Sequence, residues 1–332
     1  MTTQTTRPTA SRLTAKGSGA TTDRAFSGLT LGTGLLVLAI LALILITTAK
    51  EAWPALDYAG LGFITEKSWI PVDINGAGPV YGALSFLYGT AIVSLIALLF
   101  AVPTSIGIAL FLTELAPRRL RSTVVTVIDL LASVPSVVFG LWGIVVVGPA
   151  LVKVYDGIHG AVSGIPVLRS IFGVPVSSGR GFMTAGIIVA IMIVPIITSI
   201  TREVFATVPD ADKQAAYALG ATRWEMIRGA VFPHSFGGMV GAIMLGLGRA
   251  MGETIAVALT VGAATQITPN VFASGNTLAS VIALNFGDPG VPPGRSALIA
   301  LGVLLFVITV LINYAAEITV RRAEIRMRGA AK

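Results

Sequence analysis

Six long apolar runs, separated by more polar segments, dominate the hydrophobic pattern of this chain of 332 residues. About 20 helical residues cross the ~30 Å hydrocarbon core of a bilayer. In lipid, a helix also satisfies the hydrogen bonds of its own backbone. The pattern therefore predicts an all-α, polytopic membrane protein with six transmembrane helices. The expected spans are residues 29–49, 86–112, 123–152, 182–200, 236–264 and 296–316.

The segments outside these runs predict a simple domain organisation. Residues 1–28 are rich in Thr, Ser, Gly and Ala, a composition that cannot bury a core, so we expect a disordered cytoplasmic tail. Residues 29–320 form the expected transmembrane permease domain, which includes a polar segment at 202–233. Residues 321–332 form a C-terminal cytoplasmic tail. The first apolar run is longer than the apolar region of a typical signal peptide, which favours a retained anchor over a cleaved signal.

Charge and composition narrow the class of function. Most Lys and Arg residues fall in the tails and in the segments after the second and fourth runs, which predicts that both termini are cytoplasmic and that the chain is a multi-pass protein of the cell (inner) membrane. The net charge of +7 is thus a topology signal and not evidence for nucleic-acid binding. The sequence has no cysteine and only two histidines, far apart, so a metal site is not expected.

The polar segment at 202–233 carries the pattern of a short helix. Val208 and Pro209 break the preceding run, and Asp210 could cap a following helix by accepting hydrogen bonds from its free N–H groups. Gly220 can take the left-handed conformation that ends helices. We therefore predict a helix over residues 210–219, which fits either a docking surface for a partner or an amphipathic helix on the membrane. The expected docking residues are Gln214, Ala215, Ala216, Tyr217, Leu219 and Gly220.

This segment resembles the EAA loop of ABC importer permeases, whose pattern is Glu-Ala-Ala, three residues, Gly, nine residues and Ile-x-Leu-Pro. Here Gln214-Ala215-Ala216, Gly220 and Ala230-Val231-Phe232-Pro233 stand at the matching positions, with Gln214 in place of the glutamate. The resemblance implies a type I, MetI-like permease fold and a coupling helix that docks into a separate ATPase subunit. The sequence has no G-x-x-x-x-G-K-[ST] phosphate loop, so we expect ATP and Mg²⁺ on that partner and no cofactor on this chain.

The fifth run carries the charges that are most costly in a bilayer. Arg249 lies about 20 Å along a helix that starts near Phe236, and a central arginine costs ~2.5–3.5 kcal/mol. Glu253 follows four residues later, a spacing that places two side chains on one helical face. Two interpretations remain open: the two charges form a pair that locks helices together, or they line a path for an anion. In the second, Thr254 is a further candidate for the substrate pathway.

The stretch Gly-Leu-Gly-Arg-Ala-Met-Gly-Glu-Thr-Ile-Ala-Val at 246–257 is similar to phosphate-importer permeases, and more to the PstC type than to the PstA type. Residues 111–114 and 134–143 support this resemblance, which covers roughly residues 25–320. It implies a subunit that moves inorganic phosphate inward in an ATP-driven importer, without catalytic residues of its own. The implied partners are a PstA-like permease, two PstB-like ATPase subunits and a PstS-like phosphate-binding protein.

Other functions compete with this interpretation. A permease for another oxyanion, such as sulfate or molybdate, would need the same central cation. A secondary transporter or channel could use Glu253 and Asp129 as a proton or cation relay, but it would have no use for a docking segment with the EAA spacing. A membrane enzyme lacks support, because the sequence shows no paired carboxylates, Cys/His cluster or nucleophile constellation.

Overall fold

A computed structural model describes residues 20–74 and 76–330. Within these residues, six helical stretches are long and apolar enough to cross a membrane, which confirms the predicted number. The chain divides into two units, residues 1–50 and 51–332. The six stretches are Thr22–Ala59, Leu84–Leu115, Ser136–Val162, Phe182–Ala206, Arg223–Gly252 and Gly294–Arg322.

The described part of the first unit is helical and belongs to α1 (Ala20–Ala59). The helix begins at Ala20, so residues 20–28 are helical and not part of an unstructured tail as we predicted; residues 1–19 of that tail lie outside the described part. Polar side chains in α1 do not break it, because the hydroxyls of Thr33 and Thr47 donate to the carbonyl oxygens of Leu29 and Leu43, four residues earlier. Such bonds satisfy hydroxyls where water is absent.

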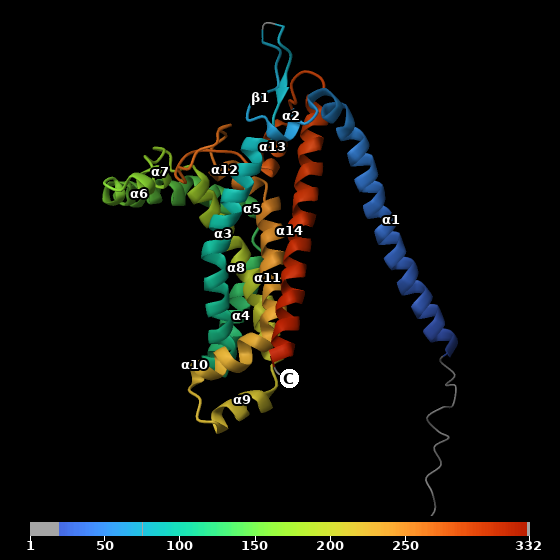
Figure 1. Cartoon of the computed structure of the whole chain (residues 1–332), viewed down its shortest axis with the longest axis vertical. Coiled ribbons are helices and arrows are strands. Elements are labelled where there is room, and N and C mark those ends of the chain that lie inside the picture. The colour runs from blue at the N-terminus through green and yellow to red at the C-terminus, as the bar shows by residue number, and fades with distance from the viewer. Residues whose placement is uncertain (1–19, 75, 331–332) are drawn as a thin grey trace, which may run out of the picture. The chain divides into compact units, whose positions relative to one another are not determined.

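The second unit is built around α8 (Phe182–Ala206), whose apolar span is the most buried of the six. It packs against α3 (Leu84–Leu110) and α11 (Phe232–Gly252), and α11 also packs against α14 (Gly294–Ala330) (Figure 1). Glycines bring these helices close together: a Cβ on Gly186 of α8 would lie 2.4 Å from the side chain of Ile96 of α3. Small residues at helix contacts are typical of membrane bundles, where dispersion contacts drive packing.

The third predicted span, residues 123–152, is not one helix. α4 (Arg118–Ala132) ends before Pro135, and a second helical stretch follows as α5 (Ser136–Trp142), the π-helix η2 (Gly143–Val147) and α6 (Gly148–Val162). Pro135 has no N–H to donate and disfavours a helical conformation at Val134, so the break falls there. α7 (Pro166–Ile171) then completes this region.

Short elements close the two ends of the bundle (Figure 1). One end carries α9 (Asp210–Ala218), α10 (Arg223–Met226) and two π-helices, η1 (Phe111–Leu115) and η3 (Ile227–Val231). The opposite end carries three short helices and a pair of short strands. These are α2 (Gly62–Thr65), the antiparallel strands β1 (Trp69–Ile70) and β2 (Val80–Tyr81), α12 (Ile255–Thr260) and α13 (Leu278–Asn285).

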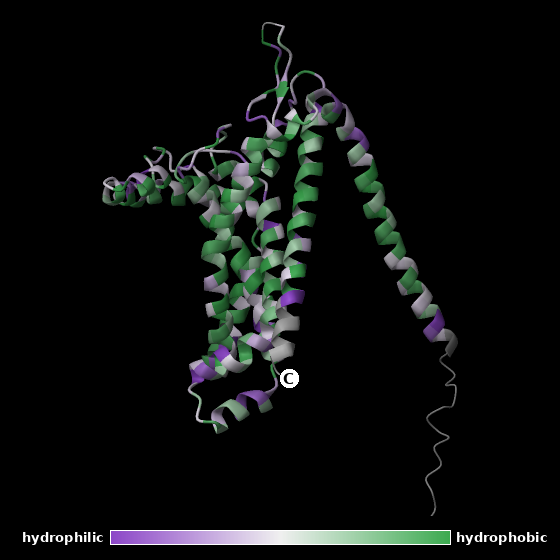
Figure 2. Cartoon of the chain, viewed as in Figure 1, coloured by the Kyte–Doolittle hydropathy of each residue, from purple (hydrophilic) through white to green (hydrophobic). Residues whose placement is uncertain are grey.

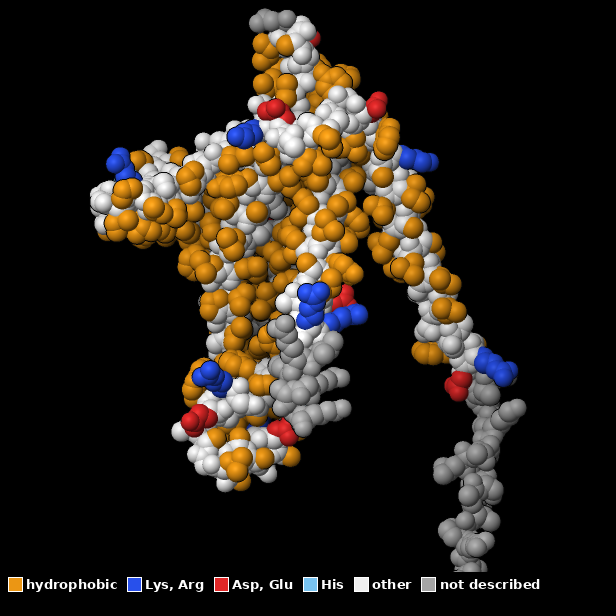
Figure 3. Space-filling view, viewed as in Figure 1, with side chains coloured by type: hydrophobic (Ala, Val, Ile, Leu, Met, Phe, Trp, Pro, Cys, Tyr) orange, Lys and Arg blue, Asp and Glu red, His pale blue; other side chains and the backbone are white. Residues whose placement is uncertain are grey.

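The distribution of side chains in the second unit fits a membrane crossing. Hydrophobic residues follow the middles of the long helices, and hydrophilic residues gather at α9 and α10 (Figure 2). In the space-filling view, hydrophobic side chains cover the visible flank of the bundle (Figure 3). α14 continues to Ala330, so residues 321–330 are helical and our prediction of a separate tail is corrected there; residues 331–332 lie outside the described part.

The contact at Gly186 gives a first testable prediction. Gly186→Leu should lower the thermal midpoint of unfolding of the purified chain in detergent, because overpacking a helix contact costs about 1–3 kcal/mol. Gly107→Leu on α3 is the matched control, since a Cβ at Gly107 meets no atom within 4 Å. Equal midpoints for the two variants would contradict the packing described here.

Candidate functional site

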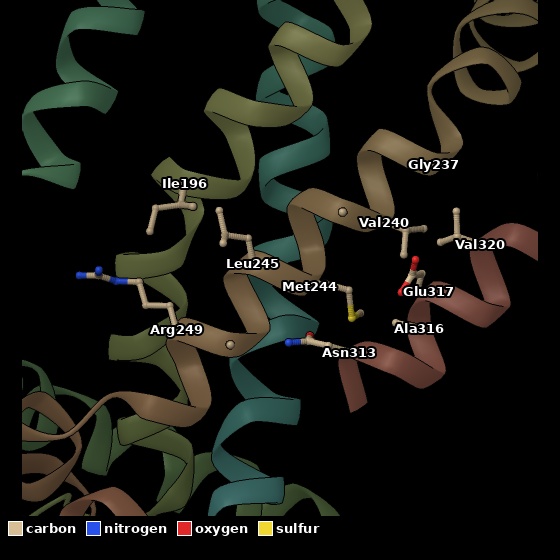
Figure 4. A pocket seen from close by; sticks show the side chains of 12 residues that line it. Ile196, Gly237, Val240, Met244, Leu245, Arg249, Asn313, Ala316, Glu317 and Val320 are labelled. Atoms are coloured by element: carbon tan, nitrogen blue, oxygen red, sulfur yellow. The ribbon is translucent and has the colours of Figure 1, made fainter. Parts of the chain in front are cut away.

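The candidate substrate site is a groove of about 680 Å³ between α11 and α14, closed on a third side by Ile196 of α8. Its wall is mostly apolar, and its polar lining side chains are Arg249, Asn313 and Glu317. Figure 4 shows Arg249 pointing away from Glu317 and Asn313, which both belong to α14. The groove therefore has a cation on the α11 side and, on the α14 side, a carboxylate that is paired with Arg321.

Glycines make the α11 wall of this groove smooth. Gly237, Gly241 and Gly248 all line it, and their spacing of four and seven residues places them on one face of the helix. A Cβ on Gly241 or Gly248 would meet no atom within 4 Å, so the backbone itself is open to the groove. A small solute or another helix can approach α11 closely along this face.

The ion pair that is one of the two interpretations of Arg249 and Glu253 is not formed among the described residues. α11 ends at Gly252, and Glu253 takes an extended conformation with φ −67° and ψ 122°. The chain leaves the helical path after Glu253, although the two residues stand four apart in the sequence. Glu253 is 9% exposed, whereas Arg249 is exposed and lines the groove. The sequence pattern did not reveal that the fifth apolar run is broken at residues 253–254.

Thr254, the third residue predicted for the substrate pathway, lies at this break. Its hydroxyl donates to the carbonyl oxygen of Gly252 at 3.0 Å, and it precedes the first residue of α12. Its proton therefore serves the local backbone, and only its oxygen lone pairs remain to receive a donor. Of the three pathway candidates, Arg249 alone is among the residues that line the groove.

The second candidate site is the surface of α9. The helix covers Asp210–Ala218, Leu219 is its C-cap and Gly220 has φ +82°, so the predicted helix and its glycine stop are confirmed. The predicted cap is wrong, because Pro209 occupies the N-cap position and no side chain caps the helix there. Asp210 and Asp212 lie instead in the first turn, where a negative charge favours the helix dipole.

α9 has two faces. Gln214, Ala215 and Tyr217 are exposed, and Leu219 beside them is 90% exposed. Ala216 faces the other way and packs against an apolar cluster at the end of the bundle. The predicted docking residues are thus divided between an outer face that is free for a partner and one inner contact. The core of the cluster is Ala109, Phe205, Val208, Met226, Ile227 and Val231.

Sequence reasoning missed an ion pair beside this cluster. The Nζ atom of Lys213 on α9 lies 2.7 Å from the Oε1 atom of Glu114 on η1. The two side chains are only 17% and 8% exposed. Ninety-nine residues separate them in the chain, so no local pattern could have joined them. Separately, no group of three His, Asp or Glu side chains in the described part is arranged to hold a metal ion.

The sequence of this chain is similar to the sequences of known transport proteins. Residues 102–325 match the family described as "Binding-protein-dependent transport system inner membrane component". The phosphate transport system permease protein PstC of Mesorhizobium japonicum is 43% identical over 308 residues, which is 92% of each chain. PstC 1 of Mycobacterium tuberculosis is 39% identical over 288 residues, which covers 82% of this chain and 85% of that one.

Solved structures agree on the fold. The crystal structure of a bacterial ABC transporter involved in the import of the acidic polysaccharide alginate matches with a TM-score of 0.56 at 17% identity, and covers 91% of this chain and 96% of that chain. An inward-facing conformation of the MetNI methionine ABC transporter matches with a TM-score of 0.50 at 18% identity, and covers 73% and 94%. At these identities, the likeness concerns the fold alone.

The exposure of Arg249 can be tested by labelling. The natural chain has no cysteine, so Arg249→Cys introduces a single thiol. We expect a small water-soluble thiol reagent to modify it rapidly in the purified protein, because the side chain lines the open groove. Ala250→Cys is the matched control on the same turn, where the side chain is buried. Similar reaction rates at both positions would contradict the position of the groove.

Proposed function

The chain belongs to the family of binding-protein-dependent transport system inner membrane components, and from this premise we propose that it is the permease subunit of an ATP-driven ABC importer that moves inorganic phosphate inward. The single observation that carries the proposal is the similarity to PstC proteins over most of the chain. The chain is a multi-pass membrane protein and a transport subunit.

The groove supplies the electrostatic part of this function. Arg249 gives a fixed positive charge in a largely apolar wall, and an oxyanion near a guanidinium gains charge-assisted hydrogen bonds. A guanidinium also suits sulfate or molybdate, so the assignment of phosphate rests on the relatives and not on Arg249.

We further propose the partners. A PstA-like permease forms a heterodimer with this chain, two PstB-like ATPase subunits bind and hydrolyse ATP with Mg²⁺, and a PstS-like protein delivers phosphate from outside. The exposed face of α9 is the docking surface for one ATPase subunit. Both termini are cytoplasmic in this arrangement, because basic residues concentrate on the side of the membrane that holds α9 and the end of α14.

The connection from the docking surface to the groove is direct. α10, η3 and α11 form one helical stretch, Arg223–Gly252, that starts four residues after Leu219 and contains Arg249. The stretch from Arg223 to Arg249 is roughly 39 Å long at the rise of an α-helix. When the ATPase moves α9, this helix moves with it and changes the wall of the groove. Such a rigid-body motion is a common basis of alternating access.

Replacement of Arg249 tests the substrate path. Arg249→Gln should reduce ATP-driven phosphate uptake into proteoliposomes by about tenfold or more, because a charge-assisted hydrogen bond contributes about 1.5–3 kcal/mol. Arg249→Lys keeps the charge and is the control. Co-purification of the complex shows whether assembly survives the change. Full uptake by the Gln variant, or loss of assembly with it, would contradict a role for Arg249 in the path.

Crosslinking tests the docking surface. In the complex, a photoactivatable crosslinker on Tyr217→Cys should capture the ATPase subunit, because Tyr217 lies on the exposed face of α9. The same reagent on Ala216→Cys, the adjacent residue that contacts the bundle, should capture little of it. Mass spectrometry identifies the captured chain. An active complex in which Tyr217→Cys never captures an ATPase would refute the docking role.

A further inference from the structure

α9 is joined to the bundle at both of its ends by the continuous chain and along one face by side-chain contacts. Its N-terminal end continues from α8, and its C-terminal end leads through α10 to α11. α3 has no such connection, because it ends about a hundred residues earlier in the sequence. The bond between Lys213 and Glu114 links α9 to the π-helix η1 that extends α3.

This ion pair differs in kind from the others in the described residues. The Arg202–Glu203 pair is 3.8 Å long and its glutamate is 72% exposed, and both partners of the Arg321–Glu317 pair are exposed. Exposed pairs contribute little to stability. For a pair as buried as Lys213 and Glu114, removal of one partner leaves a charge without compensation in a poorly hydrated site. The two side chains therefore hold each other in place.

The surroundings of the pair bring together the ends of several helices. Phe205 at the end of α8, Ile227 and Val231 of η3, and Ala109 of α3 form one apolar cluster, and Ala216 of α9 packs against it three residues after Lys213. Two of the three π-helices of the described chain, η1 and η3, lie at this junction. Single π-helical turns inside α-helices are frequently found at functional sites.

From this geometry we propose that the Glu114–Lys213 pair is a positioning link that fixes α9 to the end of α3, so that α3 follows the coupling helix when the ATPase moves it. Chain continuity alone would move α8 and α11. The ion pair adds a direct link from α9 to the end of α3, which also packs against α8 and α11, so that these three helices shift together. This inference rests on the proposed function, since it takes the ATPase as the source of the motion.

The link itself is tested by distance measurement in the assembled complex. Spin labels on Leu115→Cys and Asp212→Cys, both exposed positions next to the pair, report the separation of η1 from α9. We expect one narrow distance distribution with and without ATP. Glu114→Gln should broaden it. A control label pair on Thr207→Cys and Asp212→Cys, joined by chain continuity, should not change. An equally narrow Leu115–Asp212 distribution in Glu114→Gln would overturn the proposal.

The consequence for coupling is measured as ATP hydrolysed per phosphate imported in proteoliposomes. Glu114→Gln and Lys213→Met should each raise this ratio about fivefold or more, the lower range of a typical coupling free energy between two sites. The reversed pair, Glu114→Lys with Lys213→Glu, should return it to within about twofold, because the attraction is restored. Glu203→Gln, which removes an exposed pair on α8, should leave the ratio unchanged.

A merely structural role predicts a different result. Uptake and ATP hydrolysis would then fall together with the amount of assembled complex, and their ratio would stay constant; this outcome overturns the proposal. If the single variants do not assemble, the reversed pair decides: a normal ratio supports the link, and a raised ratio or a broad distance distribution refutes it. Absence of phosphate uptake in the unmodified complex would count against the proposed function alone, since the label distances do not depend on the transported solute.

Discussion

Hydrocarbon offers no hydrogen-bond partner to a peptide group, and this constraint determines where the helices of this chain can break. The two breaks within apolar runs, at Ser133–Pro135 and at Glu253–Thr254, are followed by α5 and α12, which pack against each other. Gly140 of α5 permits this contact, since a Cβ there would lie 3.0 Å from the Cα of Ala256. At the first break the N–H groups of Ser133 and Val134 donate to the carbonyl oxygens of Leu130 and Leu131, so the irregular backbone is satisfied within its own segment.

The same constraint explains why the coupling end and the groove are joined by an uninterrupted helix. The stretch that contains α11 starts outside the apolar region, at Thr222, where a capping box closes its first turn: the Thr222 side chain accepts from the Glu225 N–H, and the Glu225 carboxylate accepts from Thr222. From that start, the stretch continues through the π-helical turn η3 and through Pro233, which has no N–H to donate, and ends at Gly252. α9 and the groove are thus joined by one continuous helical stretch.

The sequence was sufficient for the number of membrane crossings, for α9 and for its glycine stop, because each depends on a local pattern: a long apolar run or a residue that favours φ > 0 at Gly220. It was insufficient where the fold interrupts an apolar run, since Glu253 leaves the helix without any change in hydrophobic period. The prediction that Asp210 caps α9 was wrong because the helix starts one residue earlier than expected: Pro209 is the N-cap residue, and Asp210 already lies in the first turn. The Lys213–Glu114 contact depends on how α3 and α8 pack, and no spacing along the chain reports that.

The outer face of α9 also shows what kind of contact the docking surface can make. Gln214 stands where the EAA pattern has a glutamate, so this position offers hydrogen bonds but no charge. Leu219 and Tyr217 remain exposed to 90% and 45% although both are large and hydrophobic. Aromatic and apolar anchors in a partner's pocket carry most of the energy in many interfaces, whereas charges at the rim contribute little. In the proposed docking of α9 on an ATPase subunit, attachment is therefore expected to depend on apolar contact, while the buried charge pair of α9 faces inward and joins α9 to η1.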